Sequence, residues 1–215
     1  MTTATIQSEA NRTGQASADM DLGVLLRRKT IPLFFERVGK PVWRRKVTST
    51  NTVINQNYVD LAIDFHSLEK AYFGTANFTD GGDLTYIGDS YEELAAAAAA
   101  TVAADPAKFY LGYTAAGALQ RMYFQAPAAT VGPIWYIYYR FAVFADDTTS
   151  VNMAQYIPEQ FHWGLVEALK EEIYFERYGL GDHRYEAQRD RAMEWAVRAQ
   201  TSMEMANHTQ PRFAE

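Results

Sequence analysis

Residues 134–145 read IWYIYYRFAVFA, the most aromatic segment of the 215-residue chain. As a β-strand, this segment would turn alternate side chains to opposite faces. One face would carry Trp135, Ile137, Tyr139, Phe141 and Val143, and the other Ile134, Tyr136, Tyr138, Arg140 and Phe144. Both faces are largely apolar or amphipathic, which predicts a strand covered on both sides, either at the centre of a packed domain or with one face against another subunit. Tyr and Arg are enriched at interfaces, which favours the second arrangement, with Tyr136, Tyr138 and Arg140 as candidate subunit contacts.

Further strands are predicted before this segment. The run VTSTNTV (47–53) alternates threonines with other residues and is predicted to form a hairpin with YVDLAID (58–64), extended by 68–73. A short strand, LTYI (84–87), follows a Gly-rich turn. KFYLGY (108–113) and LQRMYF flank a turn with Gly117 and predict a second hairpin. The middle of the chain, 42–145, is therefore predicted to be β-rich.

Helices are predicted on either side of the β-rich region. Apolar spacing from Leu22 to Val38 predicts a helix that Pro32 bends or restarts and Gly39 ends. After Pro158, apolar residues recur every four positions, and Asp182 can cap a second helix after a Gly-containing break. The segment 158–203 is thus predicted to be an antiparallel helix pair.

One further helix is predicted inside the β-rich region. Ser90 and Glu93 form a capping box ahead of the Ala-rich run EELAAAAAATVAA, which Asp105 and Pro106 end. A six-Ala stretch offers little core, so this helix is predicted to lie against a surface or a neighbouring subunit, or simply to face solvent.

The chain ends differ in composition from the rest. Residues 1–20 contain almost no large apolar side chains, which predicts a flexible N-terminal arm. Residues 204–215 are predicted to be an extended tail, and 21–203 a single domain. The predicted fold class is α+β, with an N-terminal helix and a C-terminal antiparallel helix pair around an antiparallel β-rich region.

Composition excludes several classes of protein. An apolar fraction of 48% and a charged fraction of 21% are those of an ordinary globular chain, which excludes bulk disorder. The absence of cysteine excludes disulfide frameworks, thiolate metal sites and Cys nucleophiles. The first 20 residues lack a secretory signal, and no stretch approaches the roughly 18 consecutive apolar residues of a membrane span. No membrane partner is therefore expected.

Charge is unevenly distributed along the chain. Residues 27–46 contain eight basic residues and one acid, Glu36, which gives this segment a charge of +7, whereas the whole chain carries -6. Such a segment favours contact with a polyanion such as DNA, or with a complementary acidic protein surface. The alternative is that these side chains are solvated flanks of a helix and a strand. The eight residues are Arg27, Arg28, Lys29, Arg37, Lys40, Arg44, Arg45 and Lys46.

Catalytic and metal-binding motifs are scarce. Glu159 and His162 form one E-x-x-H pair, but di-iron helical bundles need two such pairs plus further glutamates, so His162 is predicted to be a hydrogen-bonded structural histidine. No H-E-x-x-H, G-x-S-x-G, phosphate-loop or G-x-G-x-x-G motif occurs. We therefore expect no enzyme activity, no catalytic residue, no metal and no cofactor.

The order of these elements resembles that of the head-to-tail adaptor proteins of tailed bacteriophages, including the gatekeeper (tail tubular protein A) type of short-tailed phages. The resemblance spans residues 22–203. It begins with the N-terminal helix and Trp43, which leads into the Thr-rich run, and continues through LTYI, the helix after Ser90, FYLGY, LQRMYF and IWYIYYRF. It ends with the helix IPEQFHWGLVEALKEE, in which Ile157, Pro158, Glu159, Phe161, His162, Leu165, Val166 and Ala168 match the family signature, and with Asp182 to Trp195, which resembles its final helix.

This resemblance implies a structural virion protein without a catalytic centre. Such proteins form a homo-oligomeric ring, typically of twelve copies, which docks beneath the portal and receives the tail, nozzle or stopper protein while genomic DNA passes through its lumen. The expected location is the virion neck, after assembly in the host cytoplasm. The alternative is a neck stopper or tail-completion protein of the same assembly, and a distant alternative is an enzyme of unknown type.

Overall fold

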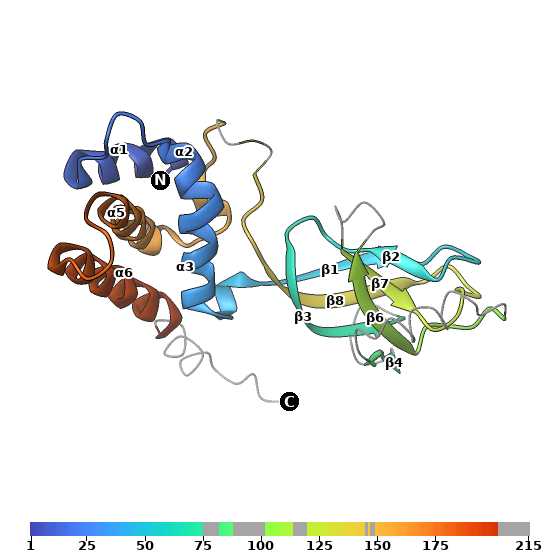
Figure 1. Ribbon diagram of the computed structural model, residues 1–215. Coiled ribbons are helices and arrows are strands. Elements are labelled where there is room, and N and C mark those ends of the chain that lie inside the picture. The colour runs from blue at the N-terminus through green and yellow to red at the C-terminus, as the bar shows by residue number, and fades with distance from the viewer. Residues whose placement is uncertain (75–81, 88–101, 114–119, 145, 147–148, 202–215) are drawn as a thin grey trace. The chain divides into compact units, whose positions relative to one another are not determined.

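The computed structural model describes residues 1–74, 82–87, 102–113, 120–144, 146 and 149–201 (Figure 1). The chain folds into two compact units, a helical unit formed by 1–44 together with 142–215, and a β unit formed by 45–141. The α+β class is confirmed. The prediction of one domain over 21–203 is wrong, because helices from both ends of the chain pack together and the β unit is inserted between them.

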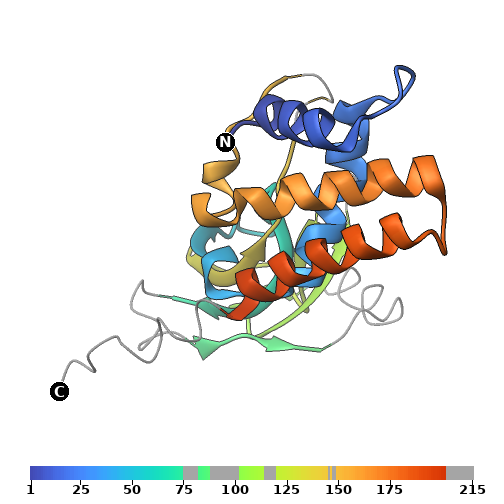
Figure 2. The ribbon, with the colours of Figure 1, turned by 90° about the vertical axis from the view of Figure 1, so that its left-hand side faces the viewer.

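The helical unit is built around the helix α5. Figure 2 shows α1, α5 and α6 side by side, with α5 in the middle. The apolar residues that recur every four positions on α5, Leu165, Leu169 and Ile173, are fully buried. The helical elements are α1 (Thr3–Gly14), α2 (Leu22–Leu25), a π-helical turn (Leu26–Thr30), α3 (Ile31–Val38), 3-10 turns (Val42–Arg44, Met153–Gln155 and Glu159–Phe161), α5 (His162–Tyr178) and α6 (His183–Thr201).

The helix pair α5 and α6 is confirmed, as are its start and its turn. Gly179 and Gly181, with φ of 73° and 86°, provide the left-handed backbone that the turn needs. Asp182 then caps α6 by accepting a hydrogen bond from the backbone N–H of Arg184 at 2.8 Å. The side chain of Arg184 also binds this carboxylate, and both bonds hold the pKa of Asp182 well below its usual range.

The prediction of a flexible arm over 1–20 is wrong. Residues 3–14 form α1, which buries Ile6 and Ala10 completely and packs on α5. Small side chains allow this close packing, since a Cβ atom on Gly14 would lie 3.2 Å from Cδ1 of Ile173. Arg177 of α5 donates hydrogen bonds to the last carbonyls of α1, which stabilises the end of a helix. The scarcity of large apolar residues therefore did not prevent ordering.

Pro32 reshapes the helix that begins at Leu22. Proline has no N–H to donate to the carbonyl four residues earlier. The N–H of Ile31 instead reaches the carbonyl of Leu26, five residues back, which defines the π-helical turn. The helix continues as α3 and ends at Gly39, which has a φ of 71°. Pro32 thus modifies the helix without ending it.

The β unit consists of two four-stranded sheets. Their strand orders are β1-β8-β3-β4 and β2-β7-β6-β5. One core joins the sheets, with Phe65 of β3, Met122 of β7 and Tyr138 of β8 among its members. The strands are β1 (Arg45–Asn51), β2 (Tyr58–Asp60), β3 (Phe65–Phe73), β4 (Gly82–Asp83), β5 (Thr85–Tyr86), β6 (Lys108–Tyr113), β7 (Gln120–Phe124) and β8 (Pro133–Arg140).

The strand pairing corrects one predicted hairpin and confirms the antiparallel pairing of the other. β1 and β2 do not pair, because β1 joins β8 and β2 joins β7 in the other sheet. β8 lies between β1 and β3, with Arg45 opposite Tyr139 at one end. β6 and β7 pair antiparallel as predicted. The Ala-rich helix, the turn at Gly117 and the tail 204–215 fall outside the described residues.

Candidate interaction surfaces

The basic segment 27–46 does not form an unpaired positive patch. At least five of its eight cations lie within 4 Å of a carboxylate, and all of these acids lie outside the segment. The predicted DNA- or portal-binding patch is therefore not present in the form that the sequence indicated. The pairs are Arg27 with Asp146, Lys29 with Glu172, Arg37 with Glu171, Arg45 with Glu69, and Lys46 with Asp64. Arg28 and Lys40 are exposed.

Three of these arginines have structural roles inside the helical unit. Arg27 is buried and donates to the backbone carbonyls of Asp146 and Thr149. These bonds hold the segment that follows the β unit against the π-helical turn. Arg44 is also buried and donates to the carbonyl of Phe35 at 3.0 Å. Arg37 forms a two-point ion pair at 2.5 and 2.7 Å with the buried carboxylate of Glu171, and this hydrogen bonding raises the pKa of Arg37.

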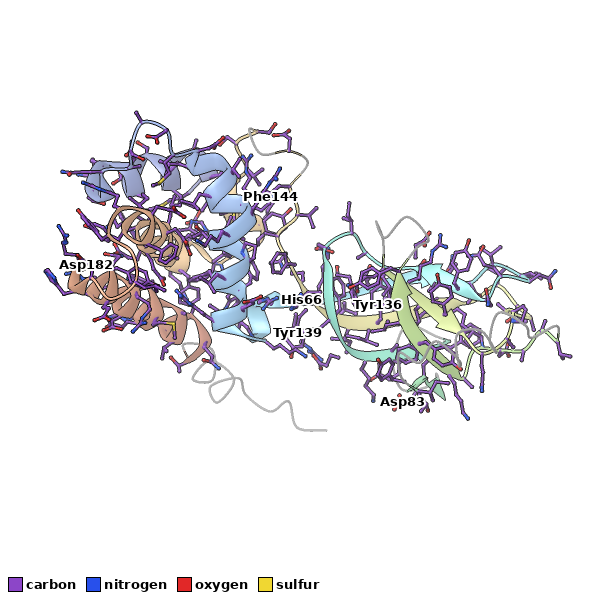
Figure 3. All side chains as sticks on the ribbon, in the orientation of Figure 1. His66, Asp83, Tyr136, Tyr139, Phe144 and Asp182 are labelled. Atoms are coloured by element: carbon purple, nitrogen blue, oxygen red, sulfur yellow. The ribbon has the colours of Figure 1, made fainter. Side chains whose placement is uncertain are left out.

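The predicted subunit contacts of β8 lie inside the protomer. Tyr136 and Tyr138 are buried in the core shared by the two sheets, and Figure 3 places Tyr136 among the strands of the β unit. The Tyr136 hydroxyl accepts from the backbone N–H of Ala62 at 2.9 Å, and the Tyr138 hydroxyl donates to Asp64 at 2.6 Å. Arg140 is half-buried at the end of the strand. The prediction that Tyr136 and Tyr138 contact another subunit is wrong, because the second sheet covers this face.

His162 is a hydrogen-bonded structural histidine, as predicted. It is buried, and its Nε2 donates to the carbonyl of Ile157 at 2.9 Å while Nδ1 lies 2.6 Å from the amino group of Met1. Burial lowers the pKa of His162. The described residues contain no cluster of three or more His, Asp or Glu side chains able to hold a metal ion.

A cluster of tyrosines and one arginine, which we call the platform, lies on the β2-β7 face opposite the core. It consists of Tyr58, Asp60, Arg121 and Tyr123. The Arg121 guanidinium lies 3.9 Å from the centre of the Tyr58 ring, and its Nε binds Asp60 at 2.6 Å. The rings of Tyr58 and Tyr123 are 5.9 Å apart. The sequence contains a signal for it, since Arg121 and Tyr123 alternate with the buried Met122 and Phe124.

A second surface, which we call the stripe, lies on α6. Met193 and Val197 are 40% and 49% exposed and lie one turn apart on the same face of the helix. The neighbouring carboxylates of Asp190 and Glu194 are largely exposed as well. Two exposed apolar side chains on one turn form a small apolar patch, and exposed apolar patches are where contacts form.

A cavity of about 740 Å³ opens at one side of the β unit. Its walls come from β3, β5, β6 and the start of β7, and include Phe65, Leu68, Phe109 and Leu111. The described lining is mainly apolar by surface area and also includes His66, Ser67, Glu69 and Lys70.

Comparison with known proteins adds no relative. No model of a known protein family matches the chain, and no curated protein sequence matches it. In the part of the chain that the structure describes, no helix combines the length and apolarity needed to cross a membrane.

Proposed function

We propose that this protein is a structural subunit of the neck of a tailed bacteriophage. Copies of the chain form a ring, of twelve subunits in the family it resembles, that joins the capsid portal to the tail. Genomic DNA passes through the lumen of this ring. The partners are the portal, the tail, nozzle or stopper protein, and further copies of the chain, and assembly takes place in the host cytoplasm.

One observation carries this proposal. The described elements follow one another along the chain in the order on which the resemblance to the adaptor family rests, with N-terminal helices, strands between Arg45 and Phe141, and the helix pair α5 and α6. The helix that begins after Pro158 carries the best-matching segment, and it forms the middle of the helical unit. Both features support an adaptor subunit.

The electrostatics also bear on this proposal. The basic side chains of 27–46 are largely engaged within each unit, so portal recognition does not depend on an unpaired positive patch. Shape and apolar contact then provide most of the binding, as is usual for permanent assemblies. The expected effect of salt on assembly is accordingly small.

The test is reconstitution with the portal encoded in the same genome. The purified protein and the portal are mixed and examined by electron microscopy and light scattering. The expected result is a ring of this protein on one end of the portal, with a copy number that matches the rotational symmetry of the portal. A protein that stays monomeric and never joins the portal would contradict the proposal.

A further inference from the structure

We infer that the strand β1 binds β1 of a second copy of the chain, and that the two strands pair antiparallel about Thr48. β1 is the terminal strand of its sheet, with β8 on one side and no paired strand on the other among the described residues (Figure 1). The inference goes beyond the proposed function and does not rest on it. A contact between two identical strands closes at two copies, so it is not the contact that repeats around a ring.

The register of β1 on β8 shows which backbone groups of β1 point away from the sheet. Directly after β1, the N–H of Thr52 donates to the carbonyl of Gly132 at 2.9 Å, and these two residues continue the same register. Backbone groups point to alternate sides along an antiparallel strand, so the even-numbered residues of β1 also bond to β8. The N–H and C=O groups of the odd-numbered residues face outward. These residues are Arg45, Val47, Ser49 and Asn51.

The outward edge of β1 is unpaired. In the parts of the chain that the structure describes, no backbone or side-chain group bonds to the N–H or C=O of Val47, Ser49 or Asn51. All three residues are exposed. An unpaired strand edge is a template for pairing with another strand. The outward edge of β1 is therefore available to a partner strand.

A second β1 matches this edge in length and in hydrogen-bond pattern. Two copies related by a twofold axis at Thr48 overlap over all seven residues of the strand. Val47 of each copy then lies opposite Ser49 of the other, so that outward groups meet outward groups, and the two Thr48 side chains face each other. Facing threonines are a favourable cross-strand pair. The other terminal strands, β2, β4 and β5, have only two or three residues and offer a shorter overlap.

The two cations of β1 do not prevent this pairing. Charged side chains on an edge strand can block association. Here Arg45 binds Glu69 and Lys46 binds Asp64 within the same copy, so both cations are already neutralised. Antiparallel pairing about Thr48 also separates the two copies of Arg45 by about 20 Å along the strands, which is beyond the roughly 10 Å screening length at 0.1 M salt.

The size of the contact determines its strength. A stable interface buries about 800 Å² on each partner, and a strand edge of seven residues, about 23 Å long, presents much less. We therefore expect a reversible dimer whose population rises with protein concentration. In the free protein, this pairing would cover an edge that otherwise promotes non-specific association.

Disulfide formation tests the pairing and its register. The chain has no cysteine, so single cysteines can be introduced on a clean background. Residues of a non-hydrogen-bonded pair have Cα atoms about 4.5 Å apart, which suits a disulfide. Thr48→Cys protein oxidised with diamide is expected to form at least about fivefold more linked dimer than Thr50→Cys protein, whose two substituted positions would lie about 14 Å apart. Mixing Thr50→Cys with Lys46→Cys should restore the product, because these positions lie opposite each other.

A proline substitution tests the hydrogen bonds of the edge. Ser49→Pro removes an outward N–H that β1 does not use in its own sheet, and proline is tolerated at such positions of edge strands. Sedimentation velocity is expected to show dimerisation at least about tenfold weaker, with an unchanged melting temperature, because outward hydrogen bonds are lost. The matched control, Thr50→Pro, removes an N–H that faces β8 and should lower the melting temperature instead.

Three results would overturn the inference: a protein that sediments as a monomer at every concentration, equal crosslinking of Thr48→Cys and Thr50→Cys, or unchanged dimerisation of Ser49→Pro. These measurements use the protein without the portal. Failure of the β1 contact would leave the proposed function standing, and a β1 dimer that never joins the portal would contradict only the adaptor role.

Discussion

Replacing Arg37 by methionine is expected to destabilise the helical unit strongly. The Glu171 side chain is only 3% exposed, and its carboxylate oxygens accept from the Arg37 guanidinium at 2.5 and 2.7 Å. Methionine removes the guanidinium and leaves a buried carboxylate without its counter-charge. Breaking a buried pair in this way costs about 3–5 kcal/mol.

The Arg45–Glu69 pair is the matched control. It also has two hydrogen bonds, from Nε and Nη2 of Arg45 at 2.8 and 2.9 Å, but both side chains are at least one-third exposed. Solvent screening limits such a pair to about 0.2–1 kcal/mol, so Arg45→Met should change stability far less. Arg37 binds through its two Nη atoms and Arg45 through Nε and Nη2, but both pairs have two hydrogen bonds, and burial is the main difference between them.

Urea unfolding followed by far-UV circular dichroism measures both changes. Arg37→Met combined with Glu171→Met should recover most of the loss, because an apolar pair can replace a buried ion pair at little cost. Equal effects of Arg37→Met and Arg45→Met, or no recovery in the double variant, would refute the reasoning that burial decides the contribution.

Three further predictions concern the helical unit. Gly164→Ala should cost about 1–3 kcal/mol in urea unfolding, because the new Cβ would lie 2.9 Å from Cε2 of Phe34, whereas Gly82→Ala meets nothing within 4 Å and should have little effect. Stability should fall as pH drops below about 6.5, because burial lowers the folded-state pKa of His162 and the unfolded chain then binds the extra proton. His162→Gln should flatten this part of the pH profile, and an unchanged slope would contradict the assignment. Ile6→Ala should cost about 2–5 kcal/mol and increase amide exchange over 3–14, because Ile6 is one of the two fully buried apolar side chains of α1.

The sequence was informative where local patterns decide the structure. The four-residue spacing after Pro158 predicted α5, and the Gly turn with Asp182 predicted the start of α6. His162 was correctly interpreted as structural, because a single E-x-x-H pair cannot build a metal site. These features depend on residues close together in the chain.

Long-range pairing could not be predicted in the same way. β1 and β2 are adjacent in sequence but belong to different sheets, because β1 pairs with the distant strand β8 and β2 pairs with β7. The acids that neutralise Arg37 and Arg45 lie far along the chain, so a local charge count overestimated the basic patch. Tyr136 illustrates the same limit, because alternation shows which face a residue takes but not what covers that face.

The register of β1 and β8 also has a consequence for how the chain folds. The helical unit has to bring together segments separated by about 100 residues, and closing a flexible loop of that length costs about 4 kcal/mol. Arg45 lies opposite Tyr139, so a folded β unit already holds both of its ends side by side. Once the β unit has folded, the two groups of helices are effectively joined by a short connection. Early folding of the β unit would therefore accelerate docking of α5 and α6 on the N-terminal helices, because the long loop between them would already be closed.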